Sequence, residues 1–381
     1  MLVRAARVLI SDRFFPSGCV VRKLNLDRSR EMWKGIIRQY PEFYHFNNDK
    51  DIITILEGNT PLIPAPKLAA RIHPDISIFF KFEGLNPTAS FKDRGMTMAV
   101  SRAVEAGSTA VICASTGNTS ASAAAYAARA GIRAFVVIPE GKIALGKLAQ
   151  AMIHGATVVK ILGNFDEALK VVRKVSEEYP ITLVNSINPH RIDGQKSAAY
   201  EVCDVLGRAP DYHFLPVGNA GNITAYWAGY RTYQDVGKIQ SLPKMMGFQA
   251  EGAAPIVRGY PIEKPETLAT AIRIGNPASW KAAEAARDES GGIIDMVSEE
   301  EIVSAYKMAA STEGIFCEPA SAASIAGLVK KSKEGLFGGG ECIVCTLTGH
   351  GLKDPDNAIK ASPDPVTCEP EMKKVLNVIG F

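Results

Sequence analysis

A lysine near the start of a predicted helix is the residue of this chain best placed to act as a nucleophile. Lys92 lies in residues 86–95, which read Asn-Pro-Thr-Ala-Ser-Phe-Lys-Asp-Arg-Gly, and apolar side chains recur at helical spacing from Met96 to Val104. The aligned N–H dipoles at a helix start disfavour a cation by roughly 0.3 to 1 kcal/mol and bias the amine toward its neutral form. A neutral amine can form an imine with a carbonyl cofactor, whereas the alternative is a solvated surface lysine.

The residues on either side of Lys92 predict where this helix begins and ends. Ser90 and Asp93 have the spacing of a capping box, and the Asn-Pro pair at 86–87 predicts a turn before them. Gly107 predicts the end of the helix, because glycine readily adopts the left-handed conformation found there. We therefore expect Lys92 in the first turn of the helix.

A loop rich in hydroxyl groups follows the next predicted strand, residues 109–114. It reads Ser115, Thr116, Gly117, Asn118, Thr119 and Ser120, and an alanine-rich helix comes after it. Short hydrogen-bonding side chains and free N–H groups at a helix start suit a carboxylate or a phosphate. An ordinary helix cap with small residues for close packing is the alternative.

A second loop has glycines where an anion-binding turn needs them. It consists of Gly218, Asn219, Ala220, Gly221 and Asn222, after a predicted strand and before a helix. Two glycines allow backbone N–H groups to turn toward a phosphate at the helix start. The G-x-x-G spacing differs from the G-x-G-x-x-G of a dinucleotide site, and a glycine turn alone is weak evidence.

Two other loops offer possible ligand contacts. Thr348 follows the last predicted strand, residues 342–347, and can present its hydroxyl to a flat ligand at the sheet edge; a plain glycine turn is the alternative. Residues 141–148, Gly-Lys-Ile-Ala-Leu-Gly-Lys-Leu, lack only the last residue of a P-loop. Because Leu148 replaces the hydroxyl that would bind Mg²⁺, a nucleotide triphosphatase is a minor possibility.

Composition limits the classes of protein that the chain can represent. Its 381 residues suffice for two domains, and 43 Lys and Arg against 40 Asp and Glu leave a net charge of only +3. We therefore expect no nucleic-acid partner, and no apolar run approaches the ~20 residues of a membrane span, so we expect no membrane partner either. Seven scattered cysteines fit a cytoplasmic protein with reduced thiols, and the six histidines have no metal-ligand spacing.

Strand and helix patterns alternate along most of the chain. Strands are expected at 76–82, 109–114, 134–138, 157–162, 181–185, 212–217, 245–250, 293–297 and 342–347. Such alternation predicts an α/β fold of two domains with mostly parallel, doubly wound sheets. Ligands of such sheets bind at the carboxyl ends of the strands, which is where the loops described above lie.

Four stretches, in this order, resemble the motifs of the threonine synthases. They read Ser-Phe-Lys-Asp-Arg-Gly, Ala-Ser-Thr-Gly-Asn-Thr-Ser-Ala-Ser, Gly-Asn-Ala-Gly-Asn and Leu-Thr-Gly-His-Gly-Leu-Lys-Asp, and the resemblance covers residues 33–360. It implies the tryptophan-synthase-β-like fold of pyridoxal-phosphate enzymes, also called fold type II. Lys92 would form the imine with the cofactor, Asn118 would bind its ring hydroxyl oxygen, and residues 218–222 would hold its phosphate.

The resemblance also implies a role for Thr348 and a reaction. Thr348 would contact the pyridine nitrogen, and a neutral residue there would leave that nitrogen less protonated. The implied reaction is a γ-elimination and β-addition that turns O-phospho-L-homoserine and water into L-threonine and phosphate. Lys92, released by imine exchange, would act as acid and base on the substrate carbons.

Such a substrate needs a second anion site, which the resemblance places after the strand at 181–185. Arg191 can grip a phosphate with two parallel hydrogen bonds, although pairing with Asp193 on the surface is an equal alternative from the sequence. The residues implied as ligands of the substrate phosphate are Arg191, Ser186, Asn185 and Thr119. Ser115 and Thr116 would lie nearer the substrate carboxylate.

The resemblance further implies a domain plan and a homodimer. A large domain would comprise residues 31–96 and 180–360, and a small mobile domain, residues 97–179, would close over the substrate. Outside the stretch that shows the resemblance, the sequence predicts an N-terminal extension at residues 1–30 and a tail at residues 361–381, whose proline- and acid-rich first part wraps the surface.

Other functions stay open at this point. A serine or threonine dehydratase usually has a different loop in place of Ser-Thr-Gly-Asn-Thr-Ser, whereas a cysteate synthase acting on O-phosphoserine is harder to separate. A non-catalytic ligand-binding protein and a nucleotide-binding module are the remaining alternatives.

Overall fold

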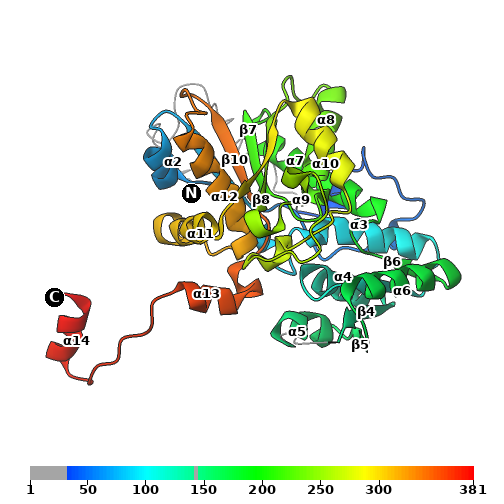
Figure 1. Ribbon diagram of the computed structural model, residues 1–381. Coiled ribbons are helices and arrows are strands. Elements are labelled where there is room, and N and C mark those ends of the chain that lie inside the picture. The colour runs from blue at the N-terminus through cyan, green and yellow to red at the C-terminus, as the bar shows by residue number, and fades with distance from the viewer. Residues whose placement is uncertain (1–31, 141–144) are drawn as a thin grey trace, which may run out of the picture.

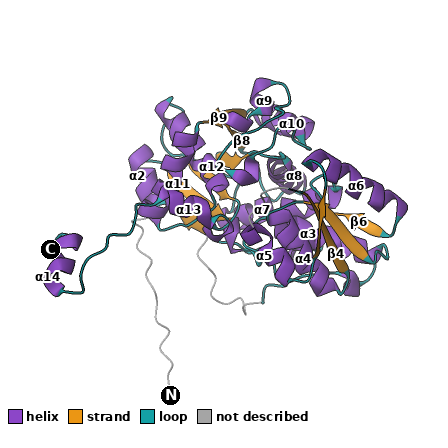
Figure 2. Ribbon diagram, turned by 60° about the horizontal axis from the view of Figure 1, so that its bottom comes forward, coloured by secondary structure: helices purple, strands orange, loops and turns teal. Residues whose placement is uncertain are grey.

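The computed structural model describes residues 32–140 and 145–381. The predicted N-terminal extension, residues 1–30, and residues 141–144 of the P-loop-like stretch lie outside the described residues. Within the described part, the strands form two sheets of six and four strands, and helices cover both faces of each sheet (Figures 1 and 2). The predicted α/β class with doubly wound, mostly parallel sheets is confirmed.

The larger sheet has the strand order β1-β2-β10-β7-β8-β9. All neighbouring strands in it are parallel except the edge pair β1 and β2, which is antiparallel. Long apolar runs form the central strands because both faces of the sheet are covered by helices. The bounds are β1 Leu62–Pro64, β2 Ser77–Phe82, β7 Tyr212–Pro216, β8 Lys244–Ala250, β9 Ile293–Val297 and β10 Cys342–Leu347.

The smaller sheet is parallel throughout, in the order β5-β4-β3-β6. Its strands are β3 Ala110–Ala114, β4 Arg133–Pro139, β5 Thr157–Ile161 and β6 Ile181–Leu183. β6 lies just beyond the boundary at residue 179 predicted for the small domain. The sheet itself therefore extends to Leu183, and the predicted domain limits stay a prediction.

The longer helices pack on these sheets in two groups. α7 (Pro189–Leu206), α8 (Gly221–Asp235) and α10 (Trp280–Ser290) share one core with the large sheet, and α2 (Pro66–Ile72), α11 (Glu299–Glu313) and α12 (Pro319–Lys333) share the core on its other face. The small sheet lies between α6 and a second set of helices. The bounds of the other helices are α1 Ile36–Gln39, α3 Lys92–Glu105, α4 Asn118–Ala130, α5 Leu145–Ile153, α6 Phe165–Glu178, α9 Pro255–Arg258, α13 Pro355–Ala361 and α14 Met372–Ile379.

Most of the strands predicted from the sequence agree with the structure within one or two residues at each end. The edge strand β1 was missed, because three residues ending in a proline give too short a pattern. α3 begins at Lys92 as predicted, but the capping box at Ser90 and Asp93 is wrong. The N-cap residue is Phe91, whose side chain makes no cap; Ser90 Oγ accepts from the Lys92 N–H at 3.4 Å, and the Asp93 carboxylate accepts hydrogen bonds from Thr88 and Ser122 instead.

The helix that carries Lys92 crosses α7 at two glycines. A side chain on Gly194 would collide with the carbonyl oxygen of Arg94, and one on Gly95 would come within 2.7 Å of the carbonyl oxygen of Arg191. The two backbones therefore approach as closely as they can, which fixes the start of α3 against the start of α7. Lys92 and Arg191 lie at these two helix starts.

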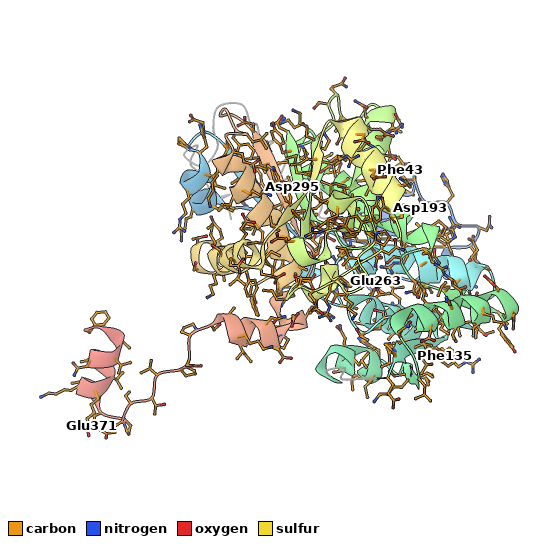
Figure 3. All side chains as sticks on the ribbon, viewed as in Figure 1. Phe43, Phe135, Asp193, Glu263, Asp295 and Glu371 are labelled. Atoms are coloured by element: carbon orange, nitrogen blue, oxygen red, sulfur yellow. The ribbon has the colours of Figure 1, made fainter. Side chains whose placement is uncertain are left out.

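The prediction that the first part of the C-terminal tail wraps the surface is wrong. After α13 the chain is exposed and runs away from the body of the protein before it ends in α14 (Figure 1). Figure 3 labels Glu371 on this projecting segment, apart from the labelled residues of the body.

Among the described residues, no helix combines the length and the apolar character that a membrane crossing requires.

Replacing Gly194 with alanine tests the close crossing of α3 and α7. We expect Gly194→Ala to lower the free energy of unfolding by about 1–3 kcal/mol, because the added methyl group forces the helices apart. Gly338→Ala is the matched control: its added carbon would make only an ordinary contact at 3.8 Å, and it should change stability by less than about 0.5 kcal/mol. Equal denaturation midpoints for both variants would contradict the crossing.

Candidate active site

The loops singled out in the sequence follow neighbouring strands. The loops that carry Lys92, Thr348 and residues 218–222 come after β2, β10 and β7, which are adjacent and parallel in the large sheet. The loops with residues 115–120 and 185–191 come after β3 and β6, which are adjacent and parallel in the small sheet. Because parallel strands end at the same sheet edge, each set of loops is gathered at one edge.

Backbone hydrogen bonds join the Lys92 loop to the Thr348 loop. The Phe91 N–H donates to the Thr348 carbonyl at 2.9 Å, and the His350 N–H donates to the Ala89 carbonyl at 3.0 Å. Ser90 and Gly349 form an isolated antiparallel bridge between these two bonds. The two loops are therefore one rigid unit, so the position of Lys92 relative to Thr348 is fixed by the backbone.

Lys92 has the chemistry expected of a nucleophilic amine. Its side chain is half-buried, with Nζ 3.7 Å from the centre of the Phe91 ring. Burial, which is the largest cause, and the positive charge of Arg191 together lower the pKa of Lys92 to about 7, although the negative charge of Glu318 opposes them. The predicted bias toward the neutral amine has the right direction, but burial and Arg191 are its causes rather than the helix dipole alone.

The residue two positions after Lys92 anchors this helix in a buried network of charges. The Arg94 guanidinium donates to both carboxylate oxygens of Glu83, at 2.6 and 2.8 Å, and to both of Glu201, each at 2.7 Å. Lys81 also donates to Glu201, at 2.6 Å. Burial alone would raise the pKa of Glu201, but Arg94 and Lys81 lower it to about 2. Two cations thus face two carboxylates.

Asp93 connects the Lys92 loop to the start of α4. Its carboxylate accepts hydrogen bonds from the Thr88 N–H at 2.7 Å, the Thr88 hydroxyl at 2.6 Å and the Ser122 hydroxyl at 2.6 Å. Burial raises the pKa of Asp93 to about 6, against the effect of these hydrogen bonds. Asp93 therefore holds the hydroxyl-rich loop of the small sheet next to Lys92.

Residues 218–222 have the backbone form of an anion cradle. Ala220 lies in the left-handed conformation, with φ of 65°, and α8 begins at Gly221 without a side-chain cap. A side-chain carbon on Gly218 would lie 3.0 Å from the Ile272 backbone, so this turn has no room for a larger residue. The first N–H groups of α8 are thus left to bind an anion. The Asn222 side chain is buried there, and its Oδ1 has no partner.

Asn185 ties the two loops of the small sheet together. Its amide oxygen accepts from the Ala114 N–H and its amide nitrogen donates to the Ala114 carbonyl, each at 2.9 Å. This pairing holds Ser115 and Thr116, both half-buried, beside the loop that contains Ser186. One amide hydrogen of Asn185 remains for a ligand. Thr119 lies in the first turn of α4 and is buried.

Arg191 is a buried cation whose charge no described carboxylate balances. It is 2% exposed, and its Nη1 donates to the Val184 carbonyl at 3.1 Å. Its Nε is buried without a partner, and burial lowers the pKa of Arg191 to about 10. The alternative of a surface pair with Asp193 is wrong, because Asp193 pairs with Lys196 instead. A buried guanidinium in this state calls for an anionic ligand.

Sequence reasoning missed Glu318, which links two of the predicted residues. It precedes α12 and is 4% exposed. Its carboxylate accepts from Thr348 Oγ1 at 2.8 Å and from Asn118 Nδ2 at 3.0 Å. Thr348 and Asn118, which follow strands of different sheets, therefore meet at one carboxylate. The only signal in the sequence was a glutamate before a proline and a run of small residues, which alone suggests a tightly packed helix start.

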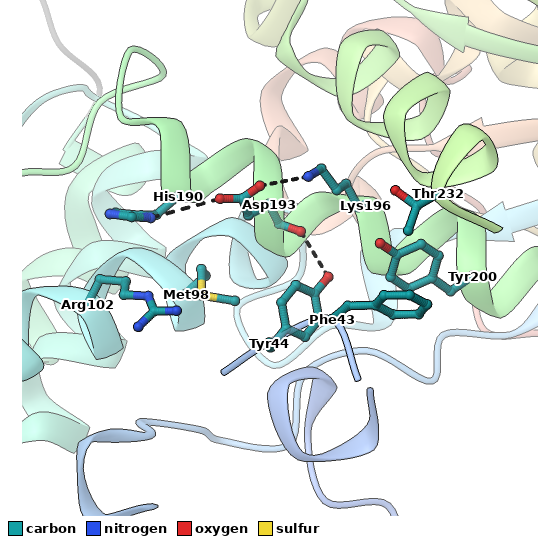
Figure 4. A pocket seen from close by; sticks show the side chains of 9 residues that line it. All are labelled: Phe43, Tyr44, Met98, Arg102, His190, Asp193, Lys196, Tyr200 and Thr232. Atoms are coloured by element: carbon teal, nitrogen blue, oxygen red, sulfur yellow. Dashed lines mark hydrogen bonds and ion pairs between the residues drawn. The ribbon is translucent and has the colours of Figure 1, made fainter. Parts of the chain in front are cut away.

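A cavity of about 320 Å³ lies beside this site rather than in it. It opens between α3, α7 and the segment around Phe43, as Figure 4 shows, and none of the predicted site residues lines it. His190 and Asp193 of α7 face this cavity, whereas Arg191 between them is buried.

Within the described residues, no group of three or more His, Cys, Asp or Glu side chains could hold a metal ion.

The pKa of Lys92 can be tested through the pH dependence of its reaction with an aldehyde. Only the deprotonated amine reacts, so the rate at which the apoprotein captures pyridoxal phosphate should rise with pH and be half-maximal near pH 7. Arg191→Gln should move this midpoint to higher pH, since it removes a nearby positive charge. The exposed control Arg71→Gln should not move it. A wild-type midpoint near the ordinary lysine value would contradict the assigned environment.

Comparison with known proteins agrees with this geometry. The family model described as "Pyridoxal-phosphate dependent enzyme" matches residues 53–349. A threonine synthase of Synechocystis sp. is 58% identical over 351 residues, which is 92% of this chain and 91% of the relative. A threonine synthase of Methanocaldococcus jannaschii is 49% identical over 366 residues, 94% of this chain and 90% of the relative.

Solved structures share the fold at much lower identity. Maize serine racemase superposes with a TM-score of 0.70 at 20% identity and covers 86% of this chain and 97% of its own. Threonine deaminase isoform 2 of Solanum lycopersicum has a TM-score of 0.69 at 22% identity, with 82% of this chain and 88% of that chain covered. The chain belongs to the pyridoxal-phosphate-dependent enzymes of fold type II and, within them, to the threonine synthase family.

Proposed function

We propose that this chain converts O-phospho-L-homoserine and water into L-threonine and phosphate, with pyridoxal phosphate as its cofactor. The observation that carries the proposal is Arg191, a buried guanidinium with an unpaired Nε, close enough to Lys92 to lower the pKa of its amine. A phosphate on the substrate would supply the missing negative charge. Serine and threonine, the substrates of a dehydratase, carry no phosphate and would leave Arg191 uncompensated.

The residues present fit pyridoxal phosphate. Lys92 offers an amine with a pKa of about 7 for attachment of the cofactor aldehyde. The uncapped start of α8, together with the left-handed Ala220, offers N–H groups for the cofactor phosphate. Asn118 keeps one amide hydrogen for the ring hydroxyl oxygen, because its other bond goes to Glu318. Thr348 completes the set at the ring nitrogen.

When bound, the cofactor supplies an electron sink that stabilises negative charge on the substrate carbon next to the amine. Lys92 then moves the protons. Comparison of substrate and product shows what it must do: Cγ gains a hydrogen as phosphate leaves, and Cβ exchanges a hydrogen for the hydroxyl of water. An amine with a pKa near 7 can accept a proton from one carbon and return it to another near neutral pH.

The substrate phosphate would lie between the two loops that follow β3 and β6 of the small sheet. Arg191 and Ser186 come from one side and Thr119 from the start of α4, with Asn185 holding both loops through Ala114. Ser115 and Thr116 would bind the substrate carboxylate. Ser122 and Asp93 keep this group beside Lys92 through their 2.6 Å hydrogen bond. Closure of the small domain over the substrate stays a prediction.

Arg191→Gln tests the role of the unbalanced guanidinium. Loss of one partner from a buried charge pair costs about 2–5 kcal/mol, so kcat/KM for phosphate release from O-phospho-L-homoserine should fall by roughly 30-fold or more. The exposed Arg71→Gln should retain the wild-type value. A wild-type kcat/KM in Arg191→Gln would remove Arg191 from the substrate site.

The same assay separates the proposed reaction from a cysteate synthase. Phosphate release from O-phospho-L-homoserine with formation of threonine is the expected result for the wild-type protein. Turnover of O-phosphoserine with sulfite, without release from O-phospho-L-homoserine, would overturn the proposed reaction while leaving the phosphate site intact.

We further propose a homodimer that works in the cytoplasm. Homodimerisation rests on the family plan, and a cytoplasmic location fits the buried free thiols in the described part of the chain, such as Cys113, Cys203, Cys317 and Cys345. Light scattering should give twice the chain mass of 40.9 kDa. A mass equal to that of one chain at micromolar concentration would contradict the dimer.

A further inference from the structure

Lys353 belongs to the last of the four motifs, and the mechanism proposed above assigns nothing to it. Its side chain is half-buried, and its Nζ donates to the Gln150 side-chain oxygen at 2.5 Å and to the Thr88 carbonyl at 3.3 Å. These two partners lie on different parts of the protein. Gln150 is on α5, which packs in a core of the small sheet, whereas Thr88 is in the turn before Lys92. One ammonium group therefore joins three segments.

The backbone of Lys353 is fixed on the side of the large sheet. Its N–H donates to the His350 carbonyl at 3.0 Å, and the Gly351 N–H donates to the Phe316 carbonyl at 3.0 Å. A side-chain carbon on Gly351 would lie 2.3 Å from the Phe316 ring, so the loop passes directly over this ring, which packs against a core of the large sheet. The base of the Lys353 side chain is thus held in place, and its far end reaches α5.

Two buried carboxylates lie near Lys353. Burial lowers the pKa of Lys353, and the negative charges of Glu318 and Asp93 act against this effect. Asp93 accepts from the Thr88 N–H, the Thr88 hydroxyl and the hydroxyl of Ser122 on α4. Two helices on the small sheet are therefore tied to Thr88, α4 through Asp93 and α5 through Lys353.

The proposed substrate must reach both sides of this junction. Its amino end would bind at the cofactor on Lys92, which follows β2 of the large sheet, and its phosphate would bind at the loops that follow β3 and β6 of the small sheet. A ligand with two ends binds tightly only when its two half-sites are held at the matching distance. Because these half-sites belong to different sheets, contacts between the two sides set that distance.

We propose that Lys353 is a positioning residue that holds α5, and with it the phosphate half-site of the small sheet, at the working distance from Lys92. The inference rests on the proposed function, in which one substrate spans both half-sites. Lys353 acts through Gln150 and Thr88 and not on the reacting atoms. Loss of its ammonium group would leave each half-site intact and change the distance between them.

Lys353→Met tests the proposal, because it keeps an unbranched side chain and removes the hydrogen-bond donor. Fewer molecules would then hold the half-sites at the working distance, so KM for O-phospho-L-homoserine should rise about 10-fold. At saturation the substrate itself bridges the half-sites, so kcat should change by less than about 3-fold. Lys353→Arg retains N–H donors and should keep KM near the wild-type value. The exposed Lys360→Met is the matched control and should behave as the wild type.

Two further measurements on the holoenzyme separate a changed distance from a damaged site. The absorbance band of the imine between Lys92 and the cofactor reports one half-site. The Kd of inorganic phosphate, measured by calorimetry, reports the other. Both should equal the wild-type values in Lys353→Met, because each probe uses a single half-site. A lost band or a weaker phosphate affinity would show general damage and would overturn the positioning role.

Gln150→Met removes the same contact from the side of α5, and it keeps the inference testable if Lys353→Met fails to fold. It should raise KM in the same direction without loss of the imine band. The double variant should be no worse than Lys353→Met alone, since both changes remove one contact. Additive effects of the two changes on KM would overturn the inference.

The wild-type protein separates failure of this inference from failure of the proposed function. If it releases no phosphate from O-phospho-L-homoserine, the proposed function is overturned, and the inference with it. Normal release by the wild type, together with a wild-type KM in Lys353→Met or in Gln150→Met, would overturn the role of Lys353 alone.

Discussion

A buried network of two cations and two carboxylates fixes the start of α3, and the rest of the site depends on it. Arg94 forms ion pairs with Glu83, which directly follows β2, and with Glu201 of α7. Lys81, within β2, also forms an ion pair with Glu201. Breaking such a buried pair by removing one partner typically costs about 3–5 kcal/mol, because a charge is left uncompensated. Since Lys92 lies two residues before Arg94, its backbone is held by the same contacts.

The two buried arginines of this region have opposite roles. Arg94 is satisfied by two carboxylates and holds the fold together, whereas Arg191 is bonded to a backbone carbonyl and keeps a buried Nε without a partner. Both lie where α3 and α7 cross at Gly95 and Gly194. The crossing therefore brings an unbalanced positive charge next to an amine of lowered pKa. One bound phosphate would balance the positive charge of Arg191 and would change the pKa of the Lys92 amine.

Local patterns predicted the architecture and most loops of the site. Apolar strands and the loops that follow them are written in consecutive residues, so Lys92, Asn118 and Thr348 could be proposed from the sequence and its resemblance to a family. Contacts between residues that lie far apart in the sequence could not be predicted from it. Glu83 and Glu201 look like ordinary acidic residues in the sequence. The spacing of Asp93 from Ser90 predicted a helix cap, because nothing in the sequence shows that Asp93 contacts Ser122, far along the chain. Glu318 gave no signal until folding brought it to Thr348.

We propose that one site joins a covalent lysine anchor, a cofactor-phosphate cradle and a separate substrate-phosphate site. A crystal structure of the protein with pyridoxal phosphate and inorganic phosphate tests it most directly. We predict continuous density from Lys92 Nζ to the cofactor, the cofactor phosphate at the start of α8, and a second phosphate on Arg191 Nε. Cofactor density that is not joined to Lys92, or a second phosphate bound elsewhere with Arg191 unchanged, would contradict the account.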